Sequence, residues 1–100
     1  MANTLKVLYR GAAATSSATL YTVPSSTTTL VTSIVITNTA GTAGTYTLLF
    51  NDVSMATTVA VPANDSVIVE PKQVVGAAQT IKGLASATTI NFHITGLEIT

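Results

Sequence analysis

The chain has 100 residues, of which 47% are hydrophobic and only 8% are charged, and its formal net charge is zero. Without a basic patch to neutralise phosphates, and without a run of ~20 apolar residues to span a bilayer, neither a nucleic acid nor a membrane is expected as a partner. There is no cysteine, which excludes disulfides and thiolate metal sites, and the length corresponds to about one domain.

The N-terminal segment is predicted to be a strand or arm. Leu5, Val7 and Tyr9 fall on alternate positions, as in a strand with one apolar face. A flexible Gly/Ala/Ser stretch follows, so residues 1–17 are predicted as an N-terminal strand or arm ahead of a sandwich domain at 18–100. Two alternatives remain open: an edge strand of the chain's own sheet, or an arm exchanged between subunits. In both cases Leu5, Val7 and Tyr9 are interface candidates.

The most apolar segment of the chain runs from position 30 to position 36. Leu30, Ile34 and Ile36 would share one face of a strand, and Val31 and Val35 the other. A strand that is apolar on both faces is predicted to be central, or to have a partner on its outer face. Val31 and Val35 are therefore predicted to point outward as interface candidates.

Two later segments alternate between apolar and polar residues, which predicts half-buried strands. Their apolar positions are Tyr46, Leu48 and Phe50 in the first segment, and Ile90, Phe92 and Ile94 in the second. Gly96 is predicted to mark a β-bulge inside the last strand, which would re-aim Leu97 and Ile99.

Turn residues divide the chain at short intervals, and no amphipathic helix is predicted. Threonine, which is β-branched and suits a pleated surface, fills many positions between the apolar residues. The predicted strands lie near residues 5–10, 18–23, 29–38, 45–51, 55–61, 66–70, 79–82 and 88–99. This spacing predicts an all-β fold, an antiparallel β-sandwich of about eight short strands. Jelly-roll and immunoglobulin-like topologies both remain open.

Groups that could carry chemistry are few. His93 is the one histidine, and no serine lies in a nucleophile elbow, so no catalytic residues are predicted and the chain is not expected to be an enzyme. The acidic pairs Asn51-Asp52 and Asn64-Asp65 lie in predicted turns, where such side chains cap the backbone; a calcium site there is the alternative. No metal site and no cofactor are predicted.

Four segments mark strands and turns in a characteristic order: Leu20-Tyr21-Thr22-Val23-Pro24, Thr32-Ser33-Ile34-Val35-Ile36-Thr37-Asn38-Thr39, Val61-Pro62-Ala63-Asn64-Asp65-Ser66 and Asn91-Phe92-His93-Ile94-Thr95-Gly96-Leu97-Glu98-Ile99. Together they resemble small β-sandwich virion structural proteins of tailed bacteriophages, over about residues 18–99. The resemblance implies a structural role without cofactors, in many copies, as a symmetric homo-oligomer with a trimer favoured.

The resemblance implies localisation in the virion, after assembly in the host cytoplasm. The leading expectation is a capsid decoration or cement protein that stabilises the head by bridging major capsid subunits. The alternative is a tail component (baseplate, collar or fibre), with tail proteins as partners. A host-surface or carbohydrate-binding module is the third hypothesis.

Overall fold

The computed structural model describes residues 3–100, which contain β-strands and no helix. The strands are β1 (Asn3–Ala12), β2 (Ala18–Thr22), β3 (Thr28–Asn38), β4 (Gly44–Phe50), β5 (Val53–Val61), β6 (Asp65–Val69), β7 (Gln73–Val75), β8 (Thr80–Ala85) and β9 (Ile90–Ile99). Each of the eight predicted strands overlaps one of these. The strand that was not predicted is β7, because three residues after Pro71 are too few to show alternation.

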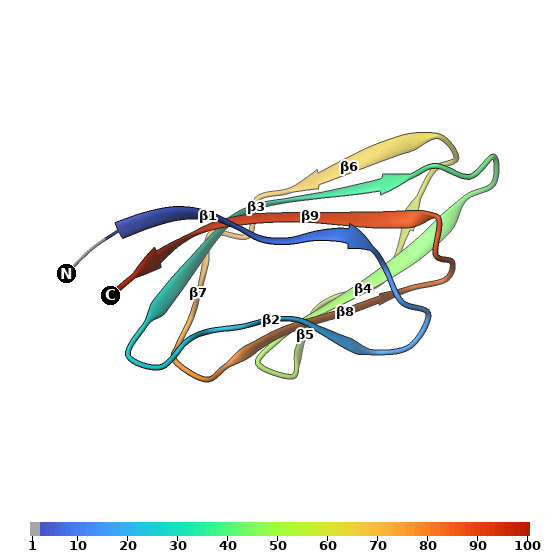
Figure 1. Cartoon of the computed structure of the whole chain (residues 1–100). Helices are drawn as coiled ribbons and strands as arrows, with labels where there is room; N and C mark the ends of the chain where they lie inside the picture. Colours follow the sequence, from blue (N-terminus) through green and yellow to red (C-terminus); the bar gives the residue numbers. More distant parts are fainter. Residues whose placement is uncertain (1–2) are drawn as a thin grey trace.

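The strands form two antiparallel sheets that pack face to face, and the all-β sandwich is thereby confirmed (Figure 1). The five-stranded sheet has the order β1-β9-β3-β6, with β7 also paired to β3, and the four-stranded sheet has the order β2-β8-β4-β5. β1 pairs with β9, β2 with β8, β3 with β6, and β4 with β5. A long hairpin wrapped around a core gives this connectivity, so the topology is that of a jelly roll.

The core lies between the sheets and is made of side chains from their facing sides. Phe92, Ile34, Ile36, Leu48 and Ile81 are among its largest fully buried members. The rings of Tyr46 and Phe92 meet edge to face, with centroids 6.3 Å apart and planes at 78°, a favourable arrangement for aromatic pairs. The alternation predicted for the β4 and β9 segments therefore places their apolar residues in the core.

A β-bulge in β3 reverses the face on which its first residues lie. The register of β3 against β9 shifts between Val31 and Ser33, so one residue is inserted and alternation resumes in the opposite phase. As a result Val31 is fully buried on the same side as Ile34, and Leu30 points outward with Val35. The prediction that Val31 points outward is wrong, because simple alternation cannot anticipate the inserted residue.

A second bulge, in β1, has the same effect. The register against β9 shifts between Val7 and Tyr9, so Leu8 is the inserted residue and lies in the core with 7% of its surface exposed. Because of the insertion, Tyr9 is on the inner side as well. Tyr9 then packs against the core, and its hydroxyl donates a hydrogen bond to the carbonyl of Ala12 at 2.8 Å. Tyr9 is therefore not on the face that carries Leu5 and Val7.

Gly96 lies in β9, where the two bulges approach from either side. Val7 and Ser33, which border the bulges, both pair with Thr95. A Cβ on Gly96 would lie 2.6 Å from the carbonyl oxygen of Leu30, so this crowding requires glycine. The bulges are in the neighbouring strands, whereas β9 alternates regularly through Gly96, so the prediction of a bulge within this strand is wrong.

The N-terminal strand belongs to the five-stranded sheet of its own chain. β1 pairs with β9 over its length and forms the sheet edge, as one of the two predicted alternatives had it. Leu8 and Ala13 are part of the core, and the backbone N–H of Ala13 donates to the carbonyl of Ile90 at 2.8 Å. Exchange of this segment between subunits stays a prediction.

Candidate interaction surface

The side of the five-stranded sheet that faces away from the core, here called the outer face, carries a continuous row of apolar side chains. Leu5 pairs with Leu97, Leu97 with Leu30, and Leu30 with Val74. Residues directly opposite each other in antiparallel strands share a face and touch. These four residues, called the apolar row, therefore cross the sheet from β1 through β9 and β3 to β7.

A second row crosses the same face nearer the other end of the strands. It consists of Arg10, His93, Val35 and Ile68, which are joined by the same kind of pairing. Between the two rows lie Val7, Thr95 and Ser33. The outer face thus has two bands with apolar side chains, separated by a band rich in hydroxyl groups.

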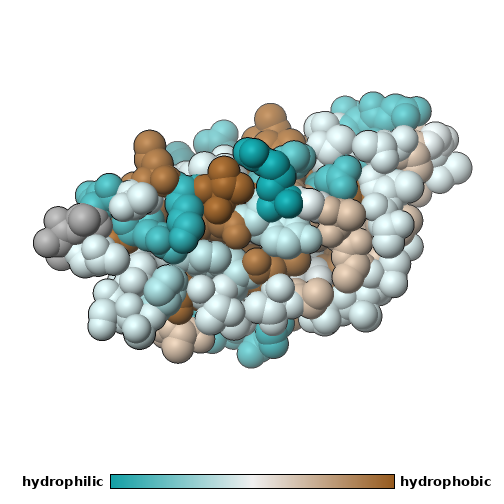
Figure 2. All heavy atoms as spheres, in the orientation of Figure 1, coloured by the Kyte–Doolittle hydropathy of each residue, from teal (hydrophilic) through white to brown (hydrophobic). Residues whose placement is uncertain are grey.

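The apolar side chains at the two edges of the outer face are strongly exposed, whereas Leu30, Leu97 and Val35 in the middle are half-buried. Leu5 is 78% exposed, Ile68 66% and Val74 65%. In Figure 2 apolar side chains project from the upper side of the molecule, where the five-stranded sheet lies. Single exposed apolar residues are ordinary, but a contiguous group on one face of a sheet marks a contact surface.

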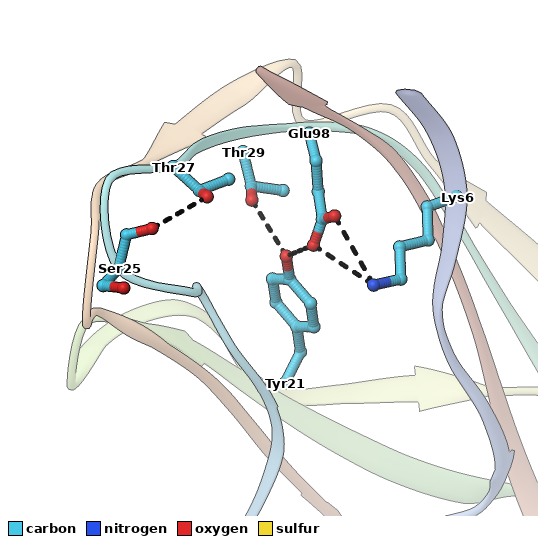
Figure 3. A network of polar contacts seen from close by, with 6 residues as sticks. All are labelled: Lys6, Tyr21, Ser25, Thr27, Thr29 and Glu98. Carbon is cyan, nitrogen blue, oxygen red and sulfur yellow. Dashed lines mark hydrogen bonds and ion pairs between the residues drawn. The ribbon is translucent and has the colours of Figure 1, made fainter. Parts of the chain in front are cut away.

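Two charged side chains of β1 and β9 are turned away from the apolar row. Lys6 and Glu98 lie on the inner side and form an ion pair with Nζ and Oε1 3.4 Å apart. The Tyr21 hydroxyl, from the other sheet, donates to Glu98 and lies 3.0 Å from the hydroxyl of Thr29 (Figure 3). This network joins the edge of the four-stranded sheet to three strands of the other sheet. It also leaves the apolar row free of these two charges.

The environment of Tyr21 changes its acidity. Burial of the ring and, next, the hydrogen bond to Glu98 raise the pKa of the hydroxyl above its ordinary value of 10.0. Both effects disfavour a phenolate, because it would lose solvation and face a carboxylate. The Tyr21 hydroxyl therefore remains a hydrogen-bond donor to Glu98.

The structure places the sequence-predicted interface residues in two groups. Leu5, Val7 and Val35 lie on the outer face, whereas Tyr9 and Val31 are turned inward by the two bulges. Sequence reasoning missed four outer-face residues: Leu30, Leu97, Val74 and Ile68. Periodicity could not find them, since they come together only through the register of separate strands.

The residues considered for chemistry are spread over the molecule. His93 lies on the outer face between Arg10 and Val35, and within residues 3–100 its ring has no hydrogen bond to a serine or an aspartate. Asp52 forms an ion pair with Lys82, with Oδ1 and Nζ 2.8 Å apart. In that same range no three His, Asp or Glu side chains gather into a metal-binding group.

The second Asn-Asp pair lines a shallow polar hollow at the end of β3. Asn64 has a φ of 53°, in agreement with the predicted turn, and the Asp65 carboxylate accepts a hydrogen bond from the backbone N–H of Ser66 at 2.8 Å. The hollow measures about 300 Å³ and is lined by Thr37, Asn38, Thr39, Asn64, Asp65 and Ser66. Its carboxylate has a local partner, which is the turn-capping role of such side chains.

Comparisons with known proteins gave no match: no family model fits the chain, and no curated protein or solved structure is significantly similar to it. The described part of the chain, residues 3–100, contains no helix able to cross a membrane. The functional argument therefore starts from the jelly-roll fold and the chemistry of the outer face.

Proposed function

We propose that this protein is a structural subunit of a virion, and specifically a bacteriophage capsid decoration protein that stabilises the head by bridging major capsid subunits. The observation that carries the proposal is the apolar row, Leu5, Leu97, Leu30 and Val74, beside which the charges of Lys6 and Glu98 are turned inward. The apolar row can dock on a neighbouring subunit without the cost of desolvating these two ions.

The composition of the chain supports a role among close neighbours. Only 8% of its residues are charged, and threonine, which carries a hydroxyl and a methyl group, is abundant. Each copy can bind weakly, because repeated attachment over a symmetric lattice raises the effective affinity. Jelly rolls are frequent in viral capsid proteins, and this support is an analogy at the level of the fold alone.

The test is to locate the protein on phage particles. Antibody-labelled particles from the source lysate are imaged by electron microscopy, and the proposal expects label distributed over the head. Label confined to the tail would replace the decoration role with the tail alternative, and particles without label would overturn the virion proposal.

Two further measurements sharpen the test. Val74→Lys places a charge in the apolar row and should lower occupancy on heads, whereas Val53→Lys, at a comparably exposed valine on β5 of the other sheet, should not. A glycan-binding screen addresses the carbohydrate hypothesis: a decoration protein shows no saturable affinity for sugars, and saturable binding would contradict the proposal.

A further inference from the structure

We propose that the outer face packs against the outer face of a second copy of this chain, forming a two-fold dimer. The axis would run parallel to the strands, between β9 and β3. The inference rests on the proposed function in taking this face as the docking surface, and it names the neighbour that covers it. It can be tested with the purified protein alone.

The apolar row matches itself under this rotation. The axis exchanges β9 with β3, and β1 with the edge formed by β6 and β7. Leu97 then lies over Leu30 of the partner subunit, and Leu5 over Val74 of the partner subunit. The middle band matches in the same way, with Thr95 facing Ser33 of the partner subunit. Face-to-face sheets keep their strand directions within about 30°, as this axis requires.

Two charged residues, Arg10 and Glu70, lie at opposite edges of the outer face. Of the eight charged residues, Lys6, Glu98, Lys82 and Asp52 form ion pairs within the chain. Arg10 lies in the second row at the β1 edge. Glu70 follows β6 at the opposite edge, directly after Val69, which packs against the core, so alternation directs Glu70 outward.

The rotation brings these opposite charges together. Arg10 then lies over Ile68 of the partner subunit, and Glu70 of the partner subunit is two residues further along that strand, about 7 Å away. An arginine side chain can span this distance. Two symmetric Arg10–Glu70 pairs would therefore flank the apolar contacts, and such complementarity fixes the register of an interface.

The area of the face fits a reversible dimer. Four strands at ~4.8 Å spacing and a strand of ten residues at ~3.4 Å per residue give a face of about 600 Å². Two copies would bury about 1,200 Å², the lower limit for specific interfaces. We therefore expect dissociation in the micromolar range, weak enough for a subunit that is also held by a lattice.

The first experiment measures the mass of the full chain by sedimentation velocity over a concentration series from about 1 μM to about 1 mM. The wild type should pass from monomer to dimer. Val74→Lys should raise the dissociation constant about tenfold or more, since it buries a charge against Leu5 of the partner subunit. Val53→Lys, the matched control, should leave it unchanged.

A charge exchange tests the proposed axis. Arg10→Glu and Glu70→Arg should each weaken the dimer several-fold, because each variant places like charges opposite each other. The double variant restores opposite charges and should recover most of the affinity. If the loss of dimer affinity in the double variant equals the losses of the two single variants added together, the proposed arrangement is wrong.

Other outcomes are equally decisive. A wild type that stays monomeric up to about 1 mM, or that forms trimers, would overturn the inference. The wild type can be monomeric while Val74→Lys still lowers the occupancy on phage heads. The outer face then binds a capsid protein, so the proposed dimer fails and the proposed function stands. If it dimerises through this face but no particle carries it, the proposed function fails and the inference stands.

Discussion

Replacement of Gly96 by alanine tests the crowded point at which the two bulges meet β9. The added Cβ would lie 2.6 Å from the carbonyl oxygen of Leu30 and 2.8 Å from Cδ1 of Leu8. Ordinary contacts of a Cβ begin at 3.4 Å. The leucine methyl could move, but the carbonyl belongs to the backbone beside the β3 bulge, so relief of the clash requires the strands to separate.

The expected loss of stability follows from the cost of overpacking this site. Forcing an extra carbon into a packed site costs about 1–3 kcal/mol, and the upper end applies because a backbone atom must move. Alanine recovers about 0.5 kcal/mol by restricting the unfolded chain. The net loss of unfolding free energy is about 2.5 kcal/mol. With an unfolding entropy of about 0.21 kcal/mol/K for a domain of this size, the melting temperature should fall by about 12 °C.

The assay is thermal unfolding followed by circular dichroism, with Gly41→Ala as the matched control. No atom lies within 4 Å of a Cβ at Gly41, and its φ is not positive. The control should therefore melt within about 3 °C of the wild type. If Gly96→Ala also melts within about 3 °C of the wild type, the reasoning about the bulges is refuted.

Two further predictions concern polar groups. Asn38→Ala removes a buried amide that donates to the carbonyls of Thr42 and Val61 and accepts from the N–H of Ala40, so the free energy of unfolding should fall by about 3 kcal/mol in urea titrations. The control Thr39→Ala loses one exposed hydrogen bond and should cost about 1 kcal/mol or less; equal losses would contradict the role of burial. The raised pKa of Tyr21 means that its contribution to stability is complete below pH 10.0 and is lost as pH rises through the folded-state pKa. The melting temperature should therefore fall less in Tyr21→Phe than in the wild type between about pH 9 and about pH 11.5. An equal fall in both proteins would show that ionisation of this hydroxyl does not control the loss of stability at high pH.

The sequence by itself determined the class of the fold. Alternation around Tyr46 and Phe92, turn residues at short intervals and the abundance of threonine are local properties, and they suffice to locate eight of the nine strands within residues 3–100. The low charge indicated a surface suited to close neighbours. These signals are readable because strand formation and turns depend on residues adjacent in the chain.

Only the tertiary structure decided which side chains share a surface. Val31 and Leu30 exchanged faces because one inserted residue in β3 reverses every side chain before it. The apolar row joins Leu5 and Val74, which are far apart in the chain and come onto one face only through pairing with intervening strands. Strand order and register are set by packing between distant segments, and periodicity within a segment carries no record of them.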